Sequence, residues 1–107
     1  MKLRPLTQYQ ARARIAKALA HPSRLLILDA LQQRPMCVCE LTELVGADQS
    51  TVSRHLAMLR QAGLVEDHKR GVMSVYQLKV SCLEGFWQCI ESVLKENLRT
   101  QRAAVGR

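Results

Sequence analysis

The chain has 107 residues, 48% of them hydrophobic, which suits a single domain with one modest core. Its formal net charge of +7 favours a polyanionic partner, while its 4% aromatic content argues against a single-strand binder that stacks bases on exposed rings. With no apolar run near the ~18 residues of a membrane span and no signal peptide, the protein is expected in the cytoplasm with its four cysteines reduced.

Apolar periodicity predicts two helices in the first third of the chain. A basic, alanine-rich helix is expected over residues 8–20, and a leucine-rich, well-buried helix over 22–34. Pro22 suits the first turn of the second helix, and Pro35 ends it. Residues 1–7 are expected to form a frayed basic lead-in.

The middle of the chain predicts a helix-turn-helix. Residues 36–39 are extended in character, a short helix follows over 40–45, and Gly46 begins the turn into a longer helix. Asp48 is the expected N-cap of that longer helix, and Gly63 its stop.

The helix after Asp48 has one apolar stripe and one polar side. Val52, Leu56 and Leu59 recur at helical period and should face the core. The other side is rich in hydrogen-bonding groups, as in a recognition helix that reads the major groove of duplex DNA. An ordinary amphipathic surface helix would carry the same stripe, so the flanking elements decide between the two. The predicted DNA contacts on this helix are Gln49, Ser50, Thr51, Ser53, Arg54 and His55.

Residues 64–70 and 72–78 predict a β-hairpin that turns at Gly71. Lys69 and Arg70 lie near its tip, where they could simply be solvated turn charges. Beside a helix-turn-helix, we expect them to contact DNA phosphates, and the hairpin is interpreted as a wing.

The longest helix is predicted over residues 81–100, with a mobile basic tail from Gln101. Its apolar side chains are spaced for one face, and so small a domain has too little core to cover that face. Part of the face is therefore predicted to be a homodimer interface, formed by Leu83, Phe86, Trp87, Ile90 and Leu94. The fold class expected for residues 1–107 is a single, mainly α domain with a β-hairpin wing, a winged helix-turn-helix.

Cys37 and Cys39 are the residues best suited to chemistry. In an extended segment their side chains point to the same side, with Val38 facing inward. Cys39 also stands where the next helix would be N-capped, and amide dipoles there should lower its pKa. Two converging thiolates suit a soft ion, such as trivalent arsenic or antimony, Cd, Zn or Cu(I). Two small, partly buried hydrophobes are the alternative interpretation.

The order of elements and several motifs resemble the winged-helix repressors of the ArsR family. The matching segments are LAHPSRLLIL at 19–28, QSTVSRHL at 49–56, LRQAGLV at 59–65 and VYQL at 75–78. The resemblance implies a homodimer that binds an inverted-repeat operator on double-stranded DNA and dissociates when an inducer binds.

The segment CVCEL at 37–41 is similar to the inducer site of the arsenical-sensing branch. In that branch a third cysteine follows three residues after the second, where this chain has Thr42. The resemblance thus implies an arsenical-resistance repressor released by As(III) or Sb(III), with no permanent cofactor. The third ligand would be Cys82, Cys89, solvent or a small thiol.

Other functions stay open. A thiol redox or persulfide sensor of the same fold would pair Cys37 or Cys39 with Cys82 or Cys89. The cadmium-sensing branch has further cysteines before this pair, and the zinc-sensing branch has Asp and His on its last helix. This chain has neither, since no cysteine precedes Cys37 and residues 80–107 contain no Asp or His.

A small thiol enzyme is disfavoured, because the sequence shows no phosphate loop, no acid pair and no His beside a Cys. His21, His55 and His68 are expected to be an interhelical polar residue, a recognition-helix side chain and a strand-surface residue, rather than metal ligands.

Overall fold

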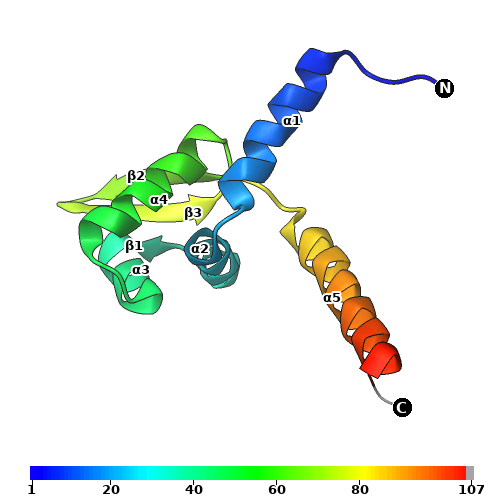
Figure 1. Ribbon diagram of the computed structural model, residues 1–107. Helices are drawn as coiled ribbons and strands as arrows, with labels where there is room; N and C mark the ends of the chain where they lie inside the picture. The colour runs from blue at the N-terminus through cyan, green and yellow to red at the C-terminus, as the bar shows by residue number, and fades with distance from the viewer. Residues whose placement is uncertain (106–107) are drawn as a thin grey trace.

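Two helices open the chain in the computed structural model, which describes residues 1–105 (Figure 1). Helix α1 (Leu6–Leu19) ends just before α2 (Pro22–Gln33), and Nδ1 of His21 caps α2 by accepting a hydrogen bond from the Ser23 amide at 3.0 Å. Pro22 occupies the first helical position, where no amide is needed. The predicted burial of this leucine-rich helix is confirmed for Leu28 and Leu31, whereas Leu26 is exposed.

The helix-turn-helix consists of α3 (Val38–Val45) and α4 (Gln49–Gln61). Gly46 ends α3 with a φ of 75°, in the left-handed region that glycine adopts without strain. Asp48 caps α4 as predicted, with its Oδ1 accepting a hydrogen bond from the Thr51 amide at 2.9 Å. These two caps fix where α3 ends and where α4 begins.

The sheet contains β1 (Met36–Cys37), β2 (Val65–Arg70) and β3 (Met73–Leu78) in the antiparallel order β1-β3-β2. The predicted hairpin is confirmed. Its strands are joined by Gly71 and Val72, and the positive φ of 62° at Gly71 is that of the first central residue of a type II′ turn.

The core lies among α2, α3, α4 and one face of the sheet. The predicted apolar stripe of α4 is confirmed, because its three members are fully buried. Burial of one such side chain stabilises the fold by roughly 1.5–3 kcal/mol. The largest fully buried side chains are Ile27, Leu28, Leu41, Val52, Leu56, Leu59 and Val65.

Helices α1 and α5 (Leu83–Val105) extend away from this body in different directions (Figure 1). The radius of gyration of 17.1 Å exceeds the roughly 13 Å of a compact domain of this length. Regular helix also covers parts of both predicted tails, from Leu6 and as far as Val105, while residues 106–107 of the predicted tail lie outside the described residues. None of the helices within residues 1–105 is long and apolar enough to cross a membrane.

Candidate functional site

The outer side of α4 offers exposed polar groups. Gln49, Ser50, Ser53 and Arg54 are all exposed. Thr51 is instead engaged in the cap, since hydrogen bonds from its side chain and amide hold the pKa of the Asp48 carboxyl below its ordinary value. Four of the six predicted DNA contacts on this helix are therefore exposed at the surface, although the Ser50 side chain also hydrogen-bonds the Asp48 carboxyl.

The tip of the wing adds positive charge to this surface. Lys69 and Arg70 are exposed at the end of β2, next to the turn at Gly71. Neither side chain forms a salt bridge within residues 1–105. Both cations are therefore available to a polyanion.

His55 is placed differently from the other predicted contacts on α4. Its ring is half-buried against His21, with the ring centroids 4.4 Å apart, and its Nδ1 lies 3.4 Å from Nη1 of Arg24. Arg24 also donates from Nε to the Ala18 carbonyl at 2.8 Å, so this junction joins α1, α2 and α4. Burial lowers the pKa of His55, and the positive charges of His21, Arg24 and Arg54 lower it further.

The sequence carried a signal for this placement, because His55 directly precedes Leu56 and borders the buried stripe of α4. The other two histidines lie where they were expected. His21 joins α2 and α4, and His68 lies on the surface of β2 with its Nε2 3.2 Å from Oε2 of Glu66.

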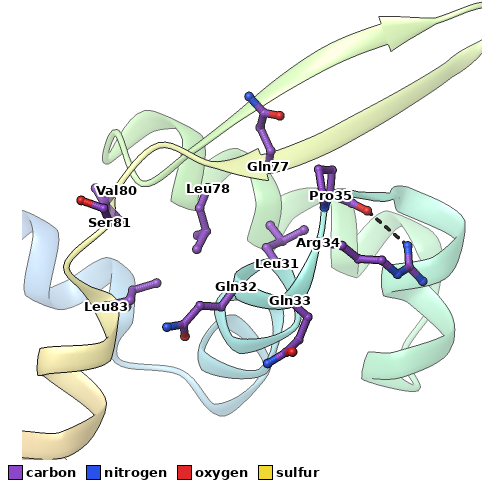
Figure 2. Close-up of a pocket in the computed structure, with 10 residues that line it drawn as sticks. All are labelled: Leu31, Gln32, Gln33, Arg34, Pro35, Gln77, Leu78, Val80, Ser81 and Leu83. Atoms are coloured by element: carbon purple, nitrogen blue, oxygen red, sulfur yellow. Dashed lines mark hydrogen bonds between the residues drawn. The ribbon is translucent and has the colours of Figure 1, made fainter.

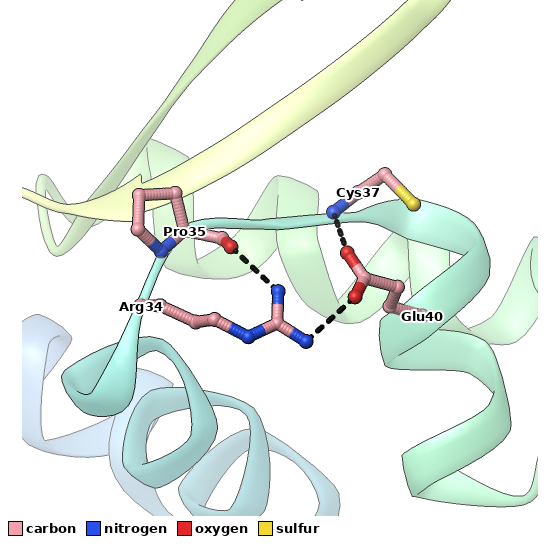
Figure 3. A network of polar contacts seen from close by, with 4 residues as sticks. All are labelled: Arg34, Pro35, Cys37 and Glu40. Atoms are coloured by element: carbon pink, nitrogen blue, oxygen red, sulfur yellow. Dashed lines mark hydrogen bonds and ion pairs between the residues drawn. The ribbon is translucent and has the colours of Figure 1, made fainter.

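The start of α3 corrects the sequence prediction for the thiols. The extended segment ends at Cys37, and Val38 and Cys39 already belong to the helix, so Cys37 rather than Cys39 is the N-cap. The cause is a capping box, in which Oε1 of Glu40 accepts a hydrogen bond from the Cys37 amide at 3.2 Å (Figure 3). Helix formation therefore begins two residues earlier than predicted.

An ion pair holds this capping box in place. Nη2 of Arg34 lies 2.7 Å from Oε2 of Glu40, and its Nη1 donates to the Pro35 carbonyl at 3.2 Å (Figure 3). The hydrogen bond from Arg34 is also the main reason why the pKa of Glu40 is lowered. The end of α2 thus fixes the backbone at Cys37.

The two thiols differ in environment but interact with each other. Cys37 is only 7% exposed, whereas Cys39 is exposed. A hydrogen bond with the Cys37 side chain, followed by desolvation, raises the pKa of Cys39, which is opposite to the predicted direction. The predicted lowering is therefore wrong, because Cys39 lies inside the first turn beside another thiol rather than at the cap.

A cleft of about 260 Å³ contains both thiols and connects three elements. Gln49, the first residue of α4, lines it together with residues at the wing turn. Its lining residues are Cys37, Val38, Cys39, Gln49, Val72, Met73 and Ser74. The cleft thus places the two candidate inducer-binding thiols beside the first residue of α4 and beside the wing turn. The sequence alone did not reveal this arrangement.

The other two cysteines lie elsewhere. Cys82 directly precedes α5 and Cys89 lies within it, both exposed, and Figure 1 shows α5 well away from α3. Within residues 1–105, no group of three or more His, Cys, Asp or Glu side chains is placed to hold a metal ion. The structure therefore does not bring Cys82 or Cys89 together with Cys37 and Cys39, and the identity of a third ligand stays a prediction.

A larger cleft of about 500 Å³ lies between the end of α2, the end of β3 and the start of α5 (Figure 2). Beside it, Gln32 accepts a hydrogen bond from Nε1 of Trp87 at 2.8 Å and donates one to Glu84 at 3.2 Å. Arg34 reaches its rim but is bonded to the Pro35 carbonyl (Figure 2). This region attaches α5 to the body.

The sequence that forms the helix-turn-helix is similar to that of known regulators. Residues 21–67, which include the whole helix-turn-helix, match the family described as bacterial regulatory protein, arsR family. The chain is also 38% identical over 76 residues to the arsenical resistance operon repressor of Staphylococcus xylosus, a match covering 71% of this chain and 73% of that protein. The chain belongs to the arsR family.

Two further comparisons agree with this assignment. The ArsR-family chain is 46% identical over 72 residues to the transcriptional regulator NmtR of Mycobacterium tuberculosis, covering 64% of this chain and 60% of that protein. Its fold matches the solution structure of Mb0332 from Mycobacterium bovis with a TM-score of 0.76 and 29% identity, over 94% of this chain and 93% of that one. That structure is described as a homodimeric winged helix-turn-helix DNA-binding domain, so the predicted fold class is confirmed.

Members of this family are transcriptional regulators, which are not enzymes, and this ArsR-family chain is a DNA-binding transcriptional regulator. It departs from the three-cysteine pattern at Thr42. The Thr42 hydroxyl donates to the Val38 carbonyl at 2.8 Å, inside α3. This residue supports the helix and offers no soft ligand to the cleft.

Proposed function

We propose that this repressor acts as a homodimer on an inverted-repeat operator and is released by As(III) or Sb(III) bound to Cys37 and Cys39. One observation carries the proposal: the two thiols and Gln49, the first residue of the recognition helix, line the same cleft. An ion captured there lies beside the element that holds DNA.

The DNA side of the proposal rests on exposure and charge. The exposed side of α4 would enter the major groove, with its N-terminal residues nearest to the base edges. Lys69 and Arg70 at the wing tip would contact the phosphates alongside. His55 would support α4 from behind through Arg24, rather than contact DNA itself.

The inducer side rests on the chemistry of paired thiols. Each thiol can replace one hydroxide of arsenous acid, with the thiol proton leaving as part of a water molecule. Because Cys37 and Cys39 line the same cleft, both replacements can take place at one arsenic atom. A hydroxide or a small cellular thiol would complete the pyramid, since Thr42 is committed to α3.

Release follows from the position of Cys37. This residue is at once the last residue of β1 and the N-cap of α3. Drawing its sulfur towards Cys39 and an ion would disturb the capping box at Glu40, and α3 leads through a short turn into α4. A local bond change thereby biases the orientation of the recognition helix between two states.

The relatives support both halves of the proposal. The Staphylococcus xylosus protein is an arsenical resistance operon repressor, and the Mb0332 structure is a homodimer. In this chain, the exposed apolar side chains along α5 provide a surface for a second copy.

Arsenite titration of operator-bound protein tests the proposal. Fluorescence anisotropy of labelled operator should fall as arsenite is added to the wild type. The double variant Cys37→Ser, Cys39→Ser should still bind operator but should not respond. The matched control Cys82→Ser, Cys89→Ser should respond as the wild type does. Arsenite release that persists in the Cys37/Cys39 variant would overturn the site.

A further inference from the structure

A thioether lies beside the two thiols. Cys37 of β1 pairs with Val75 of β3, and paired residues present their side chains to the same face of a sheet. Met73 precedes Val75 by two residues and therefore shares that face. Such a diagonal neighbour is ~7–8 Å away between Cα atoms, within reach of a long side chain.

The clefts of the molecule place the same groups together. Met73 lines the 260 Å³ cleft with Cys37 and Cys39, and it lines a neighbouring cleft of about 360 Å³ with Cys37 and Arg70. Met73 is 47% exposed and lies outside the buried core, so packing does not account for it. Its side chain is therefore not held by core packing.

We propose that Cys37, Cys39 and Met73 form an all-sulfur site for a soft monovalent ion, Cu(I) or Ag(I). The proposal rests on the proposed function in using the same two thiols, and it adds a ligand class and a third donor. Thiolate and thioether sulfur are the ligands that select Cu(I) over harder ions. On binding, both thiols release their protons to solvent and the ion keeps its single positive charge, so no electron is transferred.

The charges around the cleft suit this site. Two thiolates and one monovalent cation leave a net charge of −1. The neighbouring cleft beside Cys37 and Met73 is lined by Arg70 and by Glu40 and Arg34, and the last two neutralise each other in an ion pair. Arg70 is also one of the two wing-tip cations assigned to DNA phosphate. A loaded site would therefore attract this guanidinium away from the phosphate, and binding through Met73 would join the wing directly to the start of α3.

Met73 should distinguish the two ligand classes. Arsenic bonds to thiolates, which replace its hydroxides, while a neutral thioether has no proton with which to carry a hydroxide away. Loss of the Met73 sulfur should thus weaken the binding of Cu(I) and Ag(I) and leave the release of operator by arsenite unchanged. The same variant then separates this proposal from the proposed function.

Competition against a chromophoric Cu(I) chelator, under argon and with a thiol-free reductant, tests the site, with Ag(I) as the redox-inert counterpart. The wild type should bind one ion per chain, and Met73→Leu should weaken that affinity by at least about tenfold. The shape of leucine and the exposure of Met73 keep the fold intact, which circular dichroism can verify. Met58→Leu, an exposed methionine of α4 lining a different cleft, is the matched control and should bind as the wild type does.

Equal Cu(I) affinity in Met73→Leu and the wild type would show that Met73 is not the third ligand, independently of the result with arsenite. The separate result that arsenite never releases the wild type from operator would overturn the proposed inducer. A Met73-dependent Cu(I) site would survive that second result, so the two failures are distinguishable.

Discussion

His55 lies on the recognition helix but faces the body of the protein. Its contacts with His21 and Arg24 put two rings and a guanidinium in one half-buried junction. Protonation of His55 would place a further positive charge between His21, Arg24 and Arg54. The orientation of α4 thus depends on keeping this imidazole neutral.

This dependence predicts a loss of stability in mild acid. The folded protein holds the pKa of His55 below its ordinary value of about 6.5, so the unfolded chain takes up the proton first as the pH falls. The contribution of neutral His55 to the free energy of unfolding is fully present above pH ~6.5. It should be lost as the pH drops through the pKa that His55 has in the folded protein. Urea unfolding at several pH values should show a smaller acid loss for His55→Gln than for the wild type. An identical loss in both proteins would contradict this role.

At the scale of elements, local signals placed most of the fold correctly. Three residues determine only the local backbone conformation, so their effect could be predicted from the sequence. Pro22 marked the start of α2, Asp48 the start of α4, and Gly71 the wing turn. The candidate site was less predictable. The start of α3 depends on Glu40 and on Arg34 from another helix, a tertiary contact that periodicity does not reveal.

The same limit applies to the thiols. The sequence identified Cys37 and Cys39, but it could not place them against the wing, because that contact follows from the pairing of β1 with β3. The register of a two-residue strand is set by the rest of the sheet and not by its own side chains. The position of Met73 beside the thiols was therefore not predictable from the sequence.

The wing makes a testable contribution to DNA binding. If Lys69 and Arg70 bind phosphates, replacing both with Gln should lower operator affinity and reduce the slope of log affinity against log salt by about 0.9 for each phosphate that is no longer neutralised. Anisotropy titrations over a range of salt concentrations measure both quantities. Lys79→Gln, at the opposite end of the hairpin, is the matched control and should leave the slope unchanged. An unchanged slope in the wing variant would show that these cations are merely solvated.

At the scale of the whole molecule, the apolar stripe of α5 serves two purposes. Leu83 is 5% exposed and belongs to the core of its own chain, so it has little surface to offer a partner. Phe86 and Trp87 pack partly against that core, whereas Ile90 and Leu94 are exposed. The residues of the predicted interface therefore fall into two groups. Those near the start of α5 pack within their own chain, and those further along the helix are available to a second copy.

The extended shape of the molecule is consistent with this division. Helices α1 and α5 project from the body (Figure 1). Helix α1 also carries exposed apolar side chains, including Leu6 and Ile15. Apolar arms of this kind are stable in water when another surface covers them. A two-fold pair of chains would cover the arms and present two recognition helices to an operator with two half-sites.

Leu94→Glu tests this arrangement. Leu94 is 56% exposed, so the change should spare the fold of a single chain while placing a carboxylate in the proposed interface. Sedimentation should show a monomer where the wild type is a dimer, and affinity for the two-half-site operator should fall much more than affinity for a single half-site. Ser92→Glu adds the same charge two residues away, on the other side of α5, and should leave the dimer intact. A dimer that persists in Leu94→Glu and is lost in Ser92→Glu would place the interface on the opposite face of the helix.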